Sequence, residues 1–366
     1  MVKKDPSAYR SGDIAGLTGL QARYDEQAAR HAWPRRLRRA GGQGRRAPRG
    51  SSAASRPPAS RSRRRSTPAC RPSPSGCSAP CSRPARWSRS GPATARSWPP
   101  PTARAPAGRT TRPTGRLAPG STFKSVTSLA LLRAGLTPQT PVRCTPTVTV
   151  NGKQFKNYSD YPASAVGTIP LQEAIAQSCN TALINARAKV KDGALADAAG
   201  SLGLGIDHDL GFPAYFGKVP AKPASETEGA ANLIGQGKVL ASPMAMATVV
   251  ASIQAGKTVV PHLVAGTDVS VPAAAKPLTA AEARQAKALL RRVVTDGSGR
   301  GLADLPGGPV IAKTGTAEYA DAGTIRTHAW MIAAQGDLAV AVFVQTGTSG
   351  SQTAGPLLEE FLRGAR

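Results

Sequence analysis

Apolar residues recur at regular spacing only in the second part of the chain, from about residue 113 onward. Spacings of three and four residues predict one face of a helix, whereas alternating apolar residues predict a strand. The pattern predicts helices at 121–132, 170–190, 243–253 and 280–294, a hairpin at 148–155, strands at 310–316, 329–333 and 338–344, and a closing helix through 357–362.

Capping and turn residues support several of these boundaries. Gly135 ends the first helix, and Asn151-Gly152 is typical of a two-residue hairpin turn. Pro243 occupies the first turn of its helix, and Thr279 with Glu282 forms the sequence of a capping box. Helices that precede a run of antiparallel strands predict an α+β fold, an antiparallel sheet with flanking helices.

Composition divides the chain into three predicted regions. Residues 1–29 read as globular sequence, and Ser11-Gly12-Asp13 is expected to cap a short helix. Residues 30–112 contain one leucine and no Val, Ile, Met, Phe or Tyr, so we expect this segment to be disordered. Residues 113–366 form the third region, which we predict to be one folded domain.

The net charge of +27 comes mainly from the middle region. Between Arg30 and Arg116 lie 22 arginines with no lysine and no acidic residue; removing them from +27 leaves +5. Three explanations are open: a basic disordered linker, an arginine-rich nucleic-acid binder, or out-of-frame translation of GC-rich DNA. We favour the third, because the depletion is uniform and GC-rich codons can encode every abundant residue; no specific nucleic-acid partner is expected.

Other compositional signals are weak. Three of the five cysteines lie in the arginine-rich segment, and the remaining two, Cys144 and Cys179, predict neither a disulfide framework nor a zinc site. Cys179 is expected to be a small buried apolar residue. The four histidines lack metal-ligand spacing, so no metal is expected.

The chain has no apolar stretch of about 18 residues and no apolar core near Met1, so neither a membrane span nor a signal peptide is predicted.

Three short motifs suggest chemistry: S-x-x-K at Ser121–Lys124, S-x-N at Ser178–Asn180 and K-T-G at Lys313–Gly315. The first two are each common enough to occur by chance, as a helix cap or a turn. The three patterns each occur once, in the order found in penicillin-binding proteins and serine β-lactamases. Together they predict a nucleophilic serine site.

Each motif has an expected role in such a site. Ser121 is the candidate nucleophile, and Lys124, one helical turn away, is its candidate base once burial or a nearby cation such as Lys313 lowers its pKa. Ser178 is expected to relay a proton to the leaving amine, and Asn180 to bind the substrate amide and the Lys124 amine. A carboxylate is expected to bind to Lys313, Thr314 and Thr316. Gly315 is expected to let a peptide backbone approach the strand. The N–H groups of Ser121 and Thr316 are expected to form an oxyanion hole.

The sequence around these motifs resembles the transpeptidase domain of class B penicillin-binding proteins of the actinobacterial type. The resemblance covers about 114–366, and a shorter match at Thr18–Asp25 is similar to the linker region before such domains, so that 1–29 reads as its remnant. The segments that carry the resemblance are Gly115–Lys124, Ile234–Gly237, Ala241–Ala247, Lys313–Glu318 and His328–Met331.

This resemblance implies a peptidoglycan D,D-transpeptidase that needs no metal or organic cofactor. Ser121 is then acylated by a stem peptide or by a β-lactam antibiotic, and divisome or elongation proteins are the partners expected of the intact family. The resemblance also implies that the enzyme acts at the extracytoplasmic face of the cell membrane. A D,D-carboxypeptidase, a β-lactamase and an inactive penicillin-binding remnant remain alternatives, although the E-x-x-L-N loop of one β-lactamase class is absent.

Two departures from the family bear on activity. Family members carry a membrane anchor, and they place the first strands of the central sheet just before the S-x-x-K approach, where this chain has its Arg/Pro/Ser segment. A sheet without its N-terminal strands exposes an edge and apolar faces. We therefore expect this chain, as written, to be unstable or inactive although its motifs are present.

The out-of-frame hypothesis predicts what the parent DNA encodes. In one of the other two frames, the DNA for residues 30–112 should encode alternating apolar residues that lead into Gly115–Leu117. Translation of all three frames checks this, and strand-like sequence in neither alternative frame would refute the hypothesis.

Overall fold

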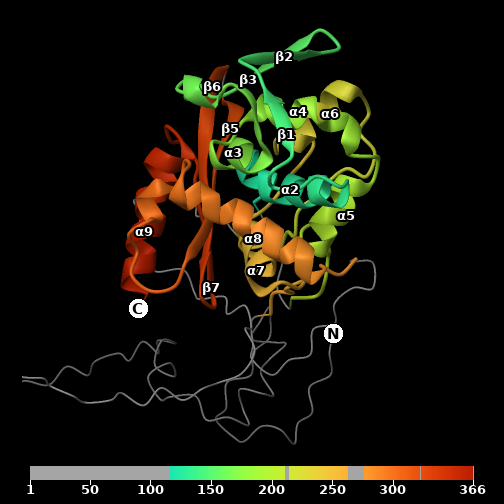
Figure 1. Cartoon of the computed structure of the whole chain (residues 1–366). Helices are drawn as coiled ribbons and strands as arrows, with labels where there is room; N and C mark the ends of the chain where they lie inside the picture. The colour runs from blue at the N-terminus through green and yellow to red at the C-terminus, as the bar shows by residue number, and fades with distance from the viewer. Residues whose placement is uncertain (1–114, 211–213, 263–275, 322, 366) are drawn as a thin grey trace, which may run out of the picture. The chain divides into compact units, whose positions relative to one another are not determined.

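The computed structural model describes residues 115–210, 214–262, 276–321 and 323–365. Several predictions fall outside the described residues: the helix after Ser11, the match at Thr18–Asp25 and the disorder of the arginine-rich segment. The same holds for the expectation that the first strands of the sheet are missing before Gly115. Figure 1 shows helices packed around the long antiparallel strands of one sheet, with smaller strand pairs outside it. The fold is thus the predicted α+β assembly.

The central sheet is built from the last three predicted strands, in the order β5-β6-β7. Their bounds are Val310–Asp321 for β5, Thr324–Gln335 for β6 and Leu338–Val344 for β7. Strands β5 and β6 are longer than predicted because their antiparallel pairing continues to Asp321 opposite Thr324. Gly336, with φ of +60°, makes the turn between β6 and β7.

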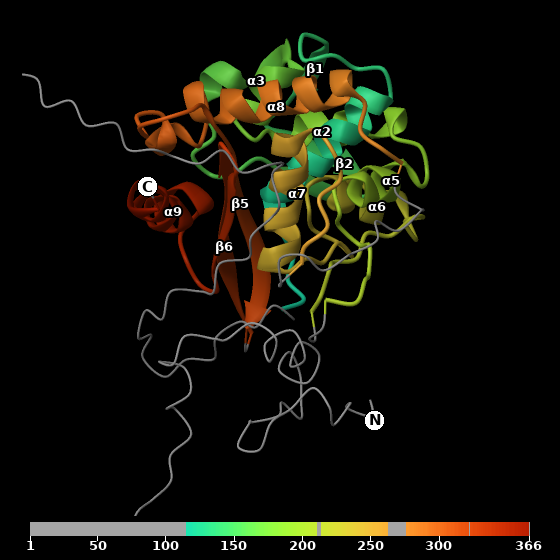
Figure 2. The same cartoon turned by 90° about the horizontal axis from the view of Figure 1, so that it is seen from below.

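Alternation along the strands divides the apolar core into two layers. In β6, Trp330 and Ile332 pack with helices α2 (Lys124–Arg133), α7 (Pro243–Ala255) and α8 (Ala280–Thr295). The intervening Met331 and Ala333 face helix α9 (Gly355–Gly364) on the other side. Figure 2 shows α7 and α9 on opposite faces of the sheet. Within the described residues β7 pairs only with β6.

Helix α2 lies at the centre of the larger layer, and all of its residues from Lys124 to Leu132 are buried. Hydroxyl side chains on this helix donate to carbonyl groups: Ser128 to Lys124 at 2.6 Å, and Thr127 to Leu233 at 2.7 Å. These buried hydroxyl groups therefore have hydrogen-bond partners inside the core. The helix follows a 3₁₀ turn, η3 (Gly120–Phe123), and Gly135 with φ of +89° follows its end, as predicted.

Smaller elements surround this centre. The predicted hairpin is present, with Asn151 and Gly152 both at positive φ, and so is the capping box of α8. The remaining elements are strand pairs β1–β4 (Pro141–Cys144 and Gly167–Pro170) and β2–β3 (Thr147–Val150 and Lys153–Lys156), helices α3 (Leu171–Ala176), α4 (Asn180–Asn185), α5 (Ala194–Ser201) and α6 (Glu226–Leu233), the 3₁₀ turns η4 (Ala163–Ala165), η5 (Arg187–Lys189) and η6 (Arg300–Leu302), and a π-helical turn, η7 (Gly350–Ala354).

The prediction of one helix across 170–190 is wrong. The chain leaves helix α3 after Ala176, and Ser178 adopts φ of +60° before α4 begins at Asn180. Apolar spacing continues through both helices, which is why periodicity alone did not reveal the break. The break turns the backbone of Ser178 toward the interior, where it contacts Lys124.

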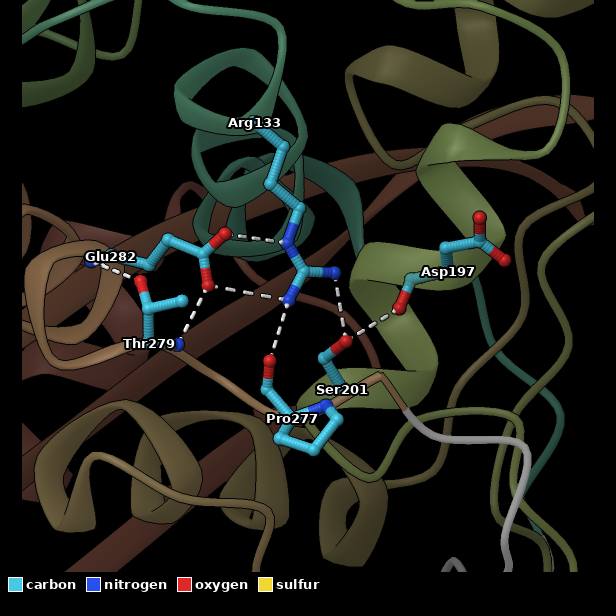
Figure 3. Close-up of polar contacts among 6 residues, drawn as sticks. All are labelled: Arg133, Asp197, Ser201, Pro277, Thr279 and Glu282. Atoms are coloured by element: carbon cyan, nitrogen blue, oxygen red, sulfur yellow. Dashed lines mark hydrogen bonds and ion pairs between the residues drawn. The ribbon is translucent and has the colours of Figure 1, made fainter.

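The far end of α2 is held by an arginine cluster (Figure 3). Arg133 donates to Glu282 at 3.0 Å and to Ser201 at 2.8 Å, and Ser201 donates to the carbonyl of Asp197 at 2.8 Å. Burial alone would raise the pKa of Glu282, but hydrogen bonds from Arg133 and Thr279 and the arginine charge lower it overall. The cluster joins α2, α5 and α8, so the helix that carries the S-x-x-K motif is fixed at its C-terminal end.

None of the helices within the described ranges is both long and apolar enough to cross a membrane.

Candidate active site

The three predicted motifs meet around the side chain of Ser178. The Lys124 amine lies 3.2 Å from the Ser178 hydroxyl and 2.6 Å from its carbonyl oxygen, to which it donates. The Lys313 amine lies 2.9 Å from the same hydroxyl. Because these residues come from α2, the α3–α4 turn and β5, the fold brings together residues that are far apart in sequence.

Ser121 lies in η3, just before the first turn of α2, and is partly exposed. The Gly120 N–H donates to the carbonyl of Gly235 at 2.9 Å, which attaches this turn to the loop after α6. Among the described residues the Ser121 hydroxyl has no hydrogen-bond partner. The turn thus carries a hydroxyl without a hydrogen-bond partner in the described part of the chain, three residues before the buried Lys124.

Asn180 adds a third contact to the Lys124 amine. Its Oδ1 accepts a hydrogen bond from Nζ of Lys124 at 2.7 Å, and its Nδ2 donates to the carbonyl of Lys156 at 2.8 Å. Both ends of the Asn180 amide are therefore used, and the carbonyl of Lys156 determines which end faces the lysine.

The K-T-G motif lies on β5, where alternate side chains take opposite faces. Lys313 pairs with Ile332 on the α2 side, whereas Thr314 pairs with Met331 on the α9 side. The hydroxyls of Thr314 and Ser298 lie 2.6 Å apart, and the N–H of Gly350 donates to the hydroxyl of Thr316 at 3.3 Å. The two threonines are thus held by the loop after α8 and by η7.

Glycines allow the surrounding segments to approach closely. A Cβ at Gly315 would lie 2.7 Å from Thr122 Cγ2 and 2.9 Å from the carbonyl oxygen of Pro119. A Cβ at Gly350 would lie 2.4 Å from the carbonyl oxygen of Trp330. Strand β5 is therefore packed directly between η3 and η7, with no room for side chains at these positions.

Electrostatics in the site are set by the two buried amines. Both lysine side chains are fully buried, and neither forms an ion pair with a carboxylate in the described part of the chain. Burial, reinforced by the charge of Lys313, holds the pKa of Lys124 well below its usual range. Burial also lowers the pKa of Lys313, to about 7. Near neutral pH the site therefore favours a neutral Lys124 beside a Lys313 that is partly protonated.

Four of the predicted site residues are in direct contact: Lys124 with Ser178 and Asn180, and Lys313 with Ser178. Ser121 lies three residues before Lys124, and its role as nucleophile stays a prediction. Thr314, Gly315 and Thr316 line the adjoining part of β5. No group of metal-ligand side chains is arranged for an ion within the described residues.

Cys179 is buried in the apolar core, as predicted, but its pairing was missed. Its sulfur is bonded to Cys144 in a disulfide that joins the S-x-N motif to the end of β1. The sequence did not predict the disulfide because two isolated cysteines carry no spacing that identifies a pair. One signal for the disulfide was available: when the three cysteines in residues 30–112 are left out, two cysteines remain, which is the number that one disulfide requires.

Two further residues were missed. Ser298 contacts the Thr314 hydroxyl, and Asn157 accepts hydrogen bonds from the backbone of Asn180 and Thr181. Neither belongs to a motif, and each reaches the site only through the fold.

Comparison with known proteins identifies the family. The transpeptidase domain of penicillin-binding proteins matches residues 101–363. The chain belongs to this family. The match begins upstream of residue 113, so the domain boundary predicted from composition remains a prediction.

Curated relatives and solved structures agree with this assignment. Peptidoglycan D,D-transpeptidase PbpA of Mycobacterium tuberculosis is 31% identical over 258 residues, which cover 66% of this chain and 52% of the relative. PbpA of Mycolicibacterium smegmatis is 33% identical over 252 residues, covering 63% of this chain and 50% of the relative. The imipenem acyl-enzyme complex of M. tuberculosis penicillin-binding protein A has 28% identity and a TM-score of 0.59, covering 69% of this chain and 61% of that one. The chain spans about half the length of the curated relatives it matches.

The close packing of η3 makes Gly235 a test of the site. Gly235 has φ of +74°, and a Cβ there would lie 2.0 Å from the carbonyl oxygen of Gly120. Gly235→Ala should lower the free energy of unfolding by about 1–2 kcal/mol for the backbone conformation, and by a further ~1–3 kcal/mol for the clash. Chemical denaturation measures this change.

Gly205→Ala is the matched control, because Gly205 has φ of +81° and nothing lies within 4 Å of the place that a Cβ would occupy there. It should show only the backbone cost. Equal losses in the two variants would contradict the close packing between Gly235 and the turn that carries Ser121.

Proposed function

We propose that this chain is a serine acyltransferase of the D,D-transpeptidase type, which forms an acyl-enzyme on Ser121. The observation that carries the proposal is the contact of two buried lysine amines with the Ser178 hydroxyl. One of these lysines, Lys124, lies three residues after Ser121, whose own hydroxyl has no hydrogen-bond partner among the described residues. A weak nucleophile needs an adjacent base, and a buried lysine without a carboxylate partner can be neutral near pH 7. The family match and the PbpA relatives support the same reading.

The first half-reaction follows from these positions. Neutral Lys124 accepts the proton of Ser121 as its oxygen attacks the carbonyl carbon of the penultimate D-alanine of a stem peptide. N–H groups of Ser121 and Thr316 stabilise the oxyanion. The proton then passes through Ser178 to the leaving amine, the peptide bond breaks, and terminal D-alanine departs.

The second half-reaction transfers the acyl group. The amine of a neighbouring stem peptide attacks the ester on Ser121, the new amide forms, and the serine regains its proton. Charged Lys313, with Thr314 and Thr316, holds the carboxylate of the donor peptide or of a β-lactam, and Asn180 orients the donor amide. The predicted approach of a peptide at Gly315 is not needed for this step, because the space beside Gly315 is taken by η3, the turn that carries Ser121.

Partners and location belong to the same proposal. Peptidoglycan stem peptides are the substrates and β-lactams the inhibitors; the M. tuberculosis neighbour was solved as an acyl-enzyme with imipenem. We place the activity at the extracytoplasmic face of the membrane, where peptidoglycan lies, with divisome or elongation proteins as partners of the intact protein.

The alternative activities differ in the second half-reaction. A carboxypeptidase would use water in place of the acceptor amine, and a β-lactamase would release the drug from Ser121.

Acylation of Ser121 is the test of this function. If the proposal holds, the purified full chain binds a fluorescent penicillin covalently at one label per chain, and Ser121→Ala abolishes the labelling. That result would overturn the expectation, drawn from the missing N-terminal strands, that the chain as written is inactive. Peptide mapping locates the label. A folded chain that is never labelled supports the inactive-remnant alternative, and rapid turnover of a chromogenic cephalosporin supports a β-lactamase.

Acylation should also depend on pH in a bell-shaped manner. The second-order rate constant should rise as Lys124 loses its proton at low pH, because the neutral amine is the base. It should fall above about pH 7, where Lys313 loses the charge that attracts the carboxylate. Stopped-flow labelling across the pH range measures both limbs.

A penicillin ester supplies the control for the alkaline limb. Because the ester has no carboxylate, its acylation should not fall as Lys313 deprotonates. A carboxylate drug whose rate stays level between pH 7 and 9 would contradict this role of Lys313.

A further inference from the structure

The S-x-N motif adopts a backbone conformation that needs external support. Ser178 has φ of +60°, in the left-handed region that L-residues other than glycine, asparagine and aspartate seldom occupy. Such a conformation is energetically unfavourable and persists only where the surroundings hold it. The contacts of Lys124 and Lys313 with Ser178 depend on this turn, so the residues that hold it bear on the chemistry.

Asn157 holds the turn. It follows strand β3 directly, and only 7% of its surface is exposed. Its Oδ1 accepts the backbone N–H of Asn180 at 2.8 Å and that of Thr181 at 3.2 Å. Its Nδ2 donates to the carbonyl of Thr145 at 3.0 Å. One buried amide therefore joins the first residues of α4 to two neighbouring backbone segments.

The residue before Asn157 orients the Asn180 side chain. The carbonyl of Lys156 accepts from Nδ2 of Asn180, so that Oδ1 of Asn180 faces the Lys124 amine. Residues 156 and 157 thus fix both the backbone and the amide of Asn180. A shift at this point would move the Lys124 contact directly.

The disulfide holds the turn next to Asn157, whose amide lies 3.5 Å from the Cys179 sulfur and 3.7 Å from the Cys144 sulfur. Cys179, between Ser178 and Asn180, is bonded to Cys144 at the end of β1. Thr181 reinforces this link, because its hydroxyl donates to the carbonyl of Thr145 at 2.6 Å and accepts from the N–H of Thr145 at 2.9 Å. The motif therefore rests on two supports, Asn157 and the disulfide.

We propose that Asn157 is a positioning residue for the acylation of Ser121, acting through Asn180, and that the Cys144–Cys179 disulfide is a second support for the same turn. The inference rests on the proposed function, since its kinetic readout is acylation. Asn157 touches neither the nucleophile nor the lysine amines in the described contacts. Its loss should therefore slow the chemical step more than it weakens the initial binding of the drug, because Asn180 contacts the Lys124 amine and is only one of the groups proposed to bind the drug.

The experiment separates these two steps in the full chain. Stopped-flow acylation by a fluorescent penicillin, over a range of drug concentrations, yields the dissociation constant of the initial complex and the first-order acylation rate constant. Asn157→Ala should lower the rate constant by roughly tenfold to a hundredfold, as expected when a catalytic group is misplaced. The dissociation constant should rise by a clearly smaller factor than the rate constant falls, because the proposed contact of the drug carboxylate with Lys313 does not involve Asn157.

Two further variants separate positioning from general destabilisation. Asn157→Asp keeps the acceptor oxygen and should have a rate constant between those of wild type and Asn157→Ala. Asn185→Ala is the matched control: the Asn185 amide on α4 donates to the carbonyl of Arg143 at 2.8 Å, away from the lysines. It should lower the melting temperature and leave the acylation rate constant unchanged.

The second support is tested in a disulfide-free background. With Cys144→Ser and Cys179→Ser present, Asn157→Ala should reduce the rate constant by a larger factor than it does in the oxidised chain. An equal factor in both backgrounds would overturn the claim that the disulfide shares this task.

A crystal structure of Asn157→Ala makes failure of the inference distinguishable from failure of the proposed function. The 2.7 Å contact between Lys124 Nζ and Asn180 Oδ1 should be lost. If wild type is never acylated but this contact breaks, the positioning role stands and the proposed function falls. If wild type is acylated and Asn157→Ala keeps both the contact and the rate, the positioning role is wrong.

Discussion

The site depends on two lysine amines buried around one serine hydroxyl, with no carboxylate among the described residues to neutralise them. Two ammonium groups in such a place would repel each other and lack hydration, so burial favours the loss of a proton from at least one. The backbone carbonyl of Ser178 and the side-chain oxygen of Asn180 receive the Lys124 amine. These neutral acceptors satisfy the amine's N–H groups without supplying the negative charge that would keep it protonated.

That electrostatic arrangement requires the dense packing around it. Water at the amines would restore their hydration and raise both pKa values, so the segments must close tightly. Glycines make this possible: Gly315 admits η3 against β5, and Gly350 admits η7 from the other side. The arginine cluster at the far end of α2 adds a second anchor, which limits how far the helix carrying Lys124 can shift.

Much of this could be predicted from sequence because motifs and periodicity are local. The order of the three motifs indicated the chemistry, and the capping residues of α7 and α8 identified both helix starts. The break at Ser178 could not be predicted, because apolar spacing runs through it without interruption. The pairing of Cys144 with Cys179 and the contacts of Asn157 arise from tertiary proximity, which no local pattern encodes.

The supports of the site differ in character from the residues they support. Lys124, Ser178 and Lys313 belong to recognisable motifs because their chemistry requires those residue types. Asn157 is required only to present one acceptor oxygen and one donor at a given place, a task that other residues on another loop could perform. Support of this kind depends on geometry more than on residue identity. A chain can therefore keep all three motifs and still lose the arrangement that makes them reactive, which is why the motifs alone establish the family but not the activity.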